Sequence, residues 1–299
     1  MSLFLQSIYL SSALSLGYIF LLVRSNPYRR TPAAPAIVAF TAGMFAVIPV
    51  VAVKRFVPLV PAATGGLFLR AAIEEVTKFS AFFLTGWRFR FPNAIEPLDY
   101  AIYFGILGVG FAIYEDFWYI FSVSYPSWTA GDPYRFSEIF RGIILARAFP
   151  GHILFDGIAG FLVGRGRVGR MRSRIGWVGG GFAIALLSHV GFNRIGESGE
   201  AALLLAYALA LVGLFLVLRK RELDRSPFPA LIDYIEGKRE DWPFPRPAID
   251  YLFADGFYWP GKGKGGLFQF YPVILSLAIL FPILIMVVYL LNRLVLLPG

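Results

Sequence analysis

The chain contains only two histidines, and each is followed four residues later by a short polar side chain. The pairs are His152 with Asp156 and His189 with Asn193. Residues four apart share one face of a helix, so the carboxylate or amide can fix the tautomer of its imidazole. Imidazoles held in this way act as metal ligands, general bases or hydrogen-bond donors. The two pairs therefore predict a site that transfers protons or binds a metal.

A second group of reactive side chains lies inside the apolar run FLRAAIEEVTKFSAFFL. It contains Glu74 and Glu75, with Lys78 one helical turn further on. A glutamate and a lysine at this spacing form an ion pair within a helix, which accounts for only one of the two glutamates. Carboxylates at membrane depth are costly to bury and are usually paired or functional. This segment is therefore a second part of the candidate site.

A further carboxylate, Glu115, stands four residues after Phe111 on the same helical face. Taken alone, Glu115 is equally well explained as a residue at the membrane boundary, because Trp118 and Tyr119 follow it and aromatic residues form interfacial belts. Its assignment to the site depends on the other motifs.

Membrane-spanning helices must position these side chains. The 299 residues are 57% hydrophobic and 16% charged, against about 45–50% and 25% in soluble domains. Apolar runs of about 20 residues, enough to cross a bilayer, recur along the chain. We therefore predict an all-α polytopic membrane protein, a single integral membrane domain over 1–299 whose helices, about eight, enclose a polar intramembrane site. The expected spans are 3–23, 35–53, 64–86, 98–121, 138–163, 175–195, 200–218 and 270–291.

The distribution of basic residues predicts the orientation. Most loop Lys and Arg follow the first, third, fifth and seventh spans, and basic loops face the cytoplasm. Both termini are therefore expected outside the cytoplasm, in a multi-pass protein of the plasma (inner) membrane, with the first span retained as a helix. At about 1.5 Å per residue, Glu74, Glu115 and both histidines fall in one layer between mid-membrane and the outer half. Lys78 and Asp156 are expected about one turn deeper.

Net charge and cysteine content exclude several kinds of site. The net charge of +9 is explained by basic loops that face anionic lipid, so the expected partners are the lipid bilayer and a protein substrate, with no nucleic acid. The absence of cysteine excludes disulfides, thiolate metal sites and a cysteine nucleophile. Any metal must be held by histidine, carboxylate or water.

Two other segments have structural consequences. Pro150 cannot donate a hydrogen bond to the carbonyl of Ala146, so the helix should distort just before His152. Irregular backbone at membrane depth normally lines a cavity.

The segment 219–269 is rich in proline and aromatic residues and is predicted to form a cytoplasmic loop or flap.

Four motifs occur in an order that resembles the PrsW family of intramembrane proteases, within the wider superfamily of CAAX prenyl proteases and bacteriocin-processing proteins. They are EExxK at 74–78, FxxxE at 111–115, HxxxD at 152–156 and a final histidine, His189. The CAAX branch has EExxxR and FxxxH, so Lys78 and Glu115 favour the PrsW branch. The resemblance covers 64–195, the expected catalytic core helices.

The resemblance implies an intramembrane endopeptidase. Its expected substrate is a single-span or membrane-associated protein, in the family's known case an anti-sigma factor cut near the outer face to begin a stress-signalling cascade. We expect Glu75 to activate water, and Glu74 to orient it through Lys78. His152 and His189 are expected as metal ligands or oxyanion donors, with Glu115 as third ligand. Supporting roles are expected for Asp156, Asn193 and Phe111.

The sequence leaves the type of protease open. Two histidines and a glutamate form a familiar catalytic set for zinc, so a protease that uses zinc or another divalent metal is one version, and a metal-free glutamate protease is the other.

Two further functions remain as alternatives. A proton-coupled transporter would use the Glu and His residues as a relay, although no inverted repeat is visible. A non-catalytic membrane receptor would use 219–269 as its partner surface.

Overall fold

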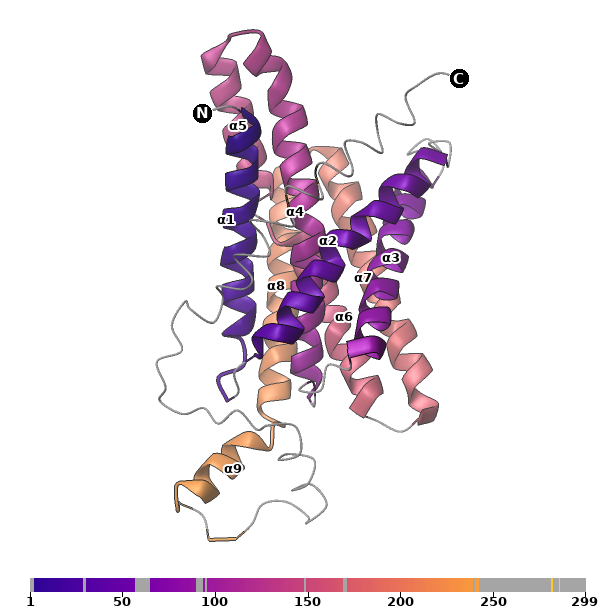
Figure 1. Ribbon diagram of the computed structural model, residues 1–299, viewed down its shortest axis with the longest axis vertical. Coiled ribbons are helices and arrows are strands. Elements are labelled where there is room, and N and C mark those ends of the chain that lie inside the picture. Colours follow the sequence, from indigo (N-terminus) through magenta and orange to yellow (C-terminus); the bar gives the residue numbers. More distant parts are fainter. Residues whose placement is uncertain are drawn as a thin grey trace.

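A bundle of long helices makes up the fold. The computed structural model describes residues 3–28, 31–56, 65–89, 94, 96–147, 149–168, 171–238, 240–241, 281 and 285. In this part of the chain the regular structure is entirely helical, as predicted. The long helices run side by side, and a short helix lies beyond one end of α8 (Figure 1). The helices are α1 (Leu3–Val23), α2 (Ala33–Phe56), α3 (Gly66–Phe89), α4 (Pro97–Thr129), α5 (Pro133–Arg147), α6 (Gly151–Val168), α7 (Met171–Ser198), α8 (Ala201–Leu223) and α9 (Phe228–Ile235).

Five of these helices are long and apolar enough to cross a membrane: α1, α2, α4, α7 and α8. They correspond to five of the predicted spans. Helix α3 has 24 residues, which is also membrane length, but it carries Arg70, Glu74, Glu75 and Lys78 among its apolar residues. The chain is therefore an all-α multi-pass membrane protein.

The predicted span 138–163 is wrong as a single helix, because the structure divides it into α5 and α6. Helix α6 begins at Gly151, and its first turn is closed by a hydrogen bond from Leu154 N to the carbonyl of Pro150 at 3.0 Å. A proline disfavours helical backbone at the residue before it and supplies no N–H of its own. Pro150 therefore starts a new helix, instead of bending an existing one, and His152 lies in the first turn of α6.

Helix α4 continues to Thr129, beyond the predicted end at residue 121, and α5 folds back along it. The turn between them has Gly131 at φ +68, a left-handed conformation that suits glycine. Asp132 then accepts hydrogen bonds from the backbone N–H groups of Tyr134 and Arg135 at 3.1 and 3.0 Å, which caps the start of α5. The two helices form a hairpin at one end of the bundle (Figure 1).

The predicted loop 219–269 begins later than expected. Residues 219–223 complete α8, and α9 occupies 228–235. The remainder of the predicted flap after residue 241 lies outside the described residues, as does the eighth predicted span, 270–291, except for Phe281 and Ile285.

Helix α4 occupies the centre of the bundle, buried along most of its length between α1, α2 and α6. Two glycines bring α2 and α4 into close contact. A Cβ atom at Gly110 would lie 2.1 Å from the carbonyl oxygen of Phe40, and one at Gly43 would lie 2.0 Å from that of Leu107. Backbone cannot yield as a flexible side chain can, so any larger residue must push the helices apart.

Replacing Gly110 by alanine should therefore destabilise the bundle by about 1–3 kcal/mol, the usual cost of overpacking. Thermal unfolding of the purified protein in detergent measures this effect. Gly213→Ala in α8 is the matched control, because a Cβ there meets nothing within 4 Å. Equal unfolding temperatures for Gly110→Ala and the native chain would contradict the close α2–α4 contact.

Candidate active site

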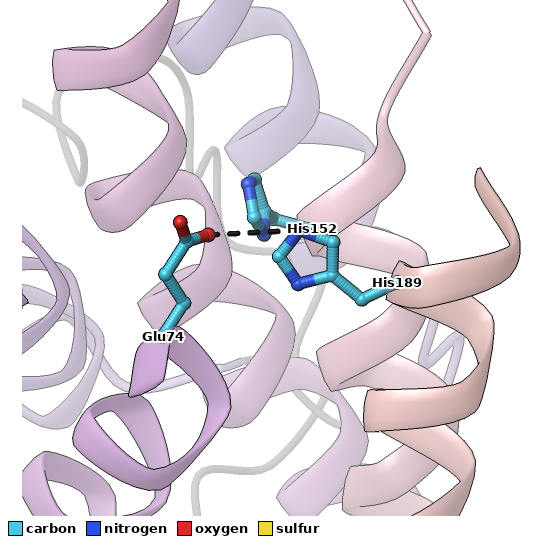
Figure 2. Close-up of side chains that lie close together, drawn as sticks. All are labelled: Glu74, His152 and His189. Atoms are coloured by element: carbon cyan, nitrogen blue, oxygen red, sulfur yellow. Dashed lines mark ion pairs between the residues drawn. The ribbon is translucent and has the colours of Figure 1, made fainter. Parts of the chain in front are cut away.

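Four helices bring the predicted site residues together. Helix α3 supplies the two glutamates and Lys78, α4 supplies Glu115, α6 supplies His152 and Asp156, and α7 supplies His189. Figure 2 shows Glu74, His152 and His189 converging from three of these helices. Direct contacts between side chains of different helices join Glu115 to His152, and Glu74 and Glu75 to His189.

A buried lysine organises the innermost part of the site. The Lys78 Nζ atom lies 2.9 Å from both carboxylate oxygens of Asp156 and 2.8 Å from Oε1 of Glu75. All three side chains are fully buried. The ion pair expected within α3 is thus formed with Glu75, and a second carboxylate arrives from α6. A charge buried at this depth is stable only when it is paired and hydrogen-bonded in this way.

His189 is oriented by Glu75. The His189 Nδ1 atom lies 2.7 Å from Glu75 Oε1, and because a carboxylate only accepts, Nδ1 carries the proton and donates. The other ring nitrogen, Nε2, is then left with a lone pair, and it faces Glu74 Oε2 at 3.5 Å. A carboxylate behind a histidine is the usual arrangement for fixing the tautomer of a metal ligand or base.

His152 is held at both ring nitrogens. Its Nδ1 atom lies 3.3 Å from Lys78 Nζ, and because an ammonium only donates, Nδ1 accepts. Nε2 therefore carries the proton and donates to Glu115 Oε2 at 2.9 Å. The ring also packs edge-on against Phe111, with centroids 5.1 Å apart. Glu115 thus belongs to the site and not only to a membrane boundary.

The sequence-based partners of the two imidazoles require correction. Asp156 was expected to orient His152 from one turn away, but both of its oxygens bind Lys78. The groups that hold His152 and His189 come from other helices, because the helices approach closely enough for side chains on facing surfaces to meet. Asn193, the other expected partner, lines the cavity described next.

A cavity of about 460 Å³ opens onto these groups. Its wall includes Glu74, Glu115, His152, His189 and Asn193, whereas Glu75, Lys78 and Asp156 lie behind that wall. Sequence reasoning did not identify the other polar wall residues. These are Ser15, Tyr18, Arg70, Asp116, Tyr119 and Glu197.

Several of these additional wall residues could have been predicted from their spacing in the sequence. Arg70 lies one turn before Glu74 on the same face of α3, and Asp116 is adjacent to Glu115. In α1, Ser15 ends a row of buried serines with Ser7 and Ser11, each four residues apart. A row of hydroxyls at helical spacing in an apolar helix marks the face that packs against other helices. Glu197 lies one turn after Asn193 on the same face of α7, and Tyr18 lies one turn after Ser15 in α1.

Three of the wall residues could hold a metal ion. Ligand atoms of Glu74, His152 and His189 all lie within 4.8 Å of one another, and all three residues are buried. Glu75 and Asp156 share the ammonium of Lys78, whereas Glu74 lies on the cavity wall beside His189, where a divalent cation would offset its charge. The residues therefore fit a metal. His189 has an Nε2 lone pair directed toward Glu74, whereas both ring nitrogens of His152 take part in hydrogen bonds.

Comparison with known proteins gives a family. No curated protein and no solved structure matches the chain. A sequence model described as PrsW family intramembrane metalloprotease matches residues 31–218, well over half of the chain. The match extends from α2 to α8 and so includes every site residue predicted from the sequence, whereas the wall residues Ser15 and Tyr18 of α1 precede it. The chain therefore belongs to the PrsW family and is an intramembrane protease.

Proposed function

We propose that this protease cuts membrane protein substrates at the cavity wall formed by Glu74, His152 and His189, by adding water to a peptide bond. The observation that supports this most strongly is the position of these three polar groups on one cavity. Hydrolysis needs an activated water and donors for the oxyanion, and both must face the space that the substrate enters.

Glu74 is the group we assign to the attacking water. Its carboxylate takes a proton from the water as the oxygen bonds to the carbonyl carbon of the scissile peptide. The same proton then passes to the leaving nitrogen as the C–N bond breaks. Glu74 lines the cavity and Glu75 does not, so we assign to Glu74 the role that the sequence suggested for Glu75.

The remaining groups stabilise charge or hold others in place. Asn193 lines the cavity, and its amide can donate to the oxyanion, whereas the Nε2–H of His152 holds Glu115 in place. Glu75 keeps Nδ1 of His189 protonated, and Lys78 binds Glu75, Asp156 and His152 together. We therefore describe Glu75, Lys78 and Asp156 as positioning residues.

The same wall would hold a metal through Glu74, His189 and His152, with Glu74 in the place that the sequence suggested for Glu115. His152 would become a ligand only after its Nε2 gives up the proton that it now donates to Glu115. Zinc is the commonest metal at two histidines and a carboxylate. Once bound, it would act as a Lewis acid on the water or on the carbonyl oxygen.

Metal binding gives a prediction that is independent of cleavage. Purified protein titrated with Zn²⁺ should bind one ion, and His189→Ala should weaken binding by at least about 100-fold, as loss of a ligand or its support does. Arg194→Ala, in the same helix and exposed, is the control. If native protein binds no Zn²⁺ in calorimetry and contains none by elemental analysis, the metal version is wrong.

From the basic loops we propose that the cavity lies in the outer half of the plasma membrane, with both termini outside the cytoplasm. We therefore propose that cleavage occurs near the outer face of the bilayer. A single-span protein of the anti-sigma type, the substrate in the family's known case, fits this geometry. Membership of a protease family makes the transporter and receptor alternatives unnecessary.

Reconstitution tests the proposed reaction. The purified chain is placed in liposomes with membrane proteins extracted from cells that lack it, and new N-termini are labelled and identified by mass spectrometry. New termini at the outer ends of transmembrane segments are expected. If the liposomes with and without the chain give the same termini, the proposed function fails.

A further inference from the structure

A groove of about 520 Å³ lies on the outer surface of the bundle between α2 and α3, lined by residues in 37–49 of α2 and 77–85 of α3. The lining contains apolar and hydroxyl side chains and no charged ones. Two of the hydroxyls, on Thr77 and Thr85, donate to carbonyl oxygens of their own helix at 2.7 Å. The groove therefore presents an essentially apolar surface toward the lipid.

The α3 wall of this groove leads directly to the active site. Arg70, Glu74, Thr77, Ala81 and Thr85 follow one another at spacings of three or four residues, so they form a single stripe along the helix. Thr77, Ala81 and Thr85 line the groove, and Arg70 and Glu74 line the cavity. One turn of α3, from Glu74 to Thr77, separates the residues that line the cavity from those that line the groove.

A second groove beside α3 does not have this continuity. It is lined by Val76, Phe79 and Phe83 together with Phe182 of α7, and it shares Ser80 and Leu84 with the α2–α3 groove. At about 100° per residue, Val76, Phe79 and Phe83 lie on the side of α3 facing away from Glu74. The α2–α3 groove is therefore the one that lies on the same face of α3 as Glu74.

The shape and chemistry of the groove suit another helix. Its small residues, Ala42 and Ala46 on α2 and Ala81 on α3, let a neighbouring helix approach closely. Pro49, which also lines the groove, cannot donate to the carbonyl of Phe45 and so loosens α2 at this level. An extended peptide could not occupy the groove at membrane depth, because its backbone groups would have no hydrogen-bond partners there.

We propose that the α2–α3 groove binds the transmembrane helix of the substrate, packed along 77–85 of α3, so that the chain beyond the helix end reaches Glu74. The proposal rests on the proteolytic function proposed above. With a rise of about 1.5 Å per residue, the scissile bond lies roughly 10 Å beyond the part of the substrate helix that contacts Ala81.

Filling the groove tests this proposal. Two substrates are compared: a membrane protein cut by the native chain in liposomes, and a water-soluble peptide that spans the same bond. Ala81→Leu should lower the cleavage rate of the membrane protein by about tenfold or more, the effect of losing one good packing contact, and should leave peptide cleavage unchanged. Ala210→Leu, exposed on α8 and outside the groove, is the matched control.

Each outcome of this comparison is informative. Equal rates for Ala81→Leu and Ala210→Leu on the membrane protein would overturn the docking proposal while leaving the protease intact. If the native chain cuts no membrane protein in liposomes, no such substrate exists and the proposed function itself is refuted. Equal loss on both substrates would show damage to the catalytic site, which also contradicts a docking role for the groove.

Cross-linking supplies a second measurement that does not depend on the folding of Ala81→Leu. The chain has no cysteine, so Phe45→Cys, at an exposed position that lines the groove, alone can carry a benzophenone probe. Combined with Glu74→Gln to slow turnover, it should cross-link to the transmembrane segment of the same membrane protein, and the same probe at Ala210→Cys should not. Cross-links only to lipid or to a second copy of the chain would overturn the proposal.

Discussion

Replacing Glu74 by glutamine is expected to abolish cleavage and leave the fold intact. Glutamine keeps the size of the side chain but can neither take a proton from water nor ligate a metal as a carboxylate does. Loss of a general base typically lowers the rate by about 10²–10⁴-fold. The measurement is the rate at which one identified bond is cut in liposomes, with circular dichroism and thermal unfolding to check the fold.

Glu200→Gln, at the exposed turn before α8, is the control for this experiment. Glu75→Gln provides the contrast, because Glu75 bonds both Lys78 and His189 behind the cavity wall. It should lower stability as well as activity, whereas Glu74→Gln should affect activity alone. Full activity of Glu74→Gln would refute the assignment of this residue to the attacking water.

The second large effect is expected at Lys78. Lys78→Met fills a similar space but leaves Glu75 and Asp156 buried without their shared cation. Breaking a buried ion pair from one side costs about 3–5 kcal/mol, because the remaining charge stays desolvated. The free energy of unfolding in detergent should fall by this amount, and proteolytic activity should be lost with it.

A double variant separates charge from packing. Adding Asp156→Asn to Lys78→Met removes one of the two unpaired charges, so part of the lost stability should return, but activity should not, because His152 and Glu75 remain without Lys78. Lys220→Met, exposed in the last turn of α8, is the control. Native stability of Lys78→Met would contradict the role of Lys78 as the buried organiser of the site.

The sequence predicted the helices and the convergence of the site for definite physical reasons. Apolar length sets which segments cross the membrane, and polar groups at similar depth on neighbouring helices have no favourable partners except each other. Glu74, Glu115, His152 and His189 could therefore be grouped from their positions alone. The order of the motifs then identified the family, which the match over 31–218 shows.

Other features depend on tertiary packing that the sequence does not reveal. Glu74 and Glu75 point about 100° apart on the helix, and only the neighbours of α3 decide which of them faces the cavity. Similarly, Pro150 is compatible with a kink or with a new helix, and the choice depends on α5 packing back against α4. The contact of Gly43 and Gly110 with opposing backbone also requires knowing which helices are adjacent.

The central claim is that the cavity with Glu74, His152 and His189 on its wall hydrolyses membrane proteins. Its most direct test is to compare the N-termini of membrane proteins in otherwise identical cells that carry the native chain, Glu74→Gln or Glu200→Gln at equal amounts. We predict a set of termini at the outer ends of transmembrane segments that is present with the native chain and Glu200→Gln and missing with Glu74→Gln. Identical termini in all three cell lines would contradict the claim.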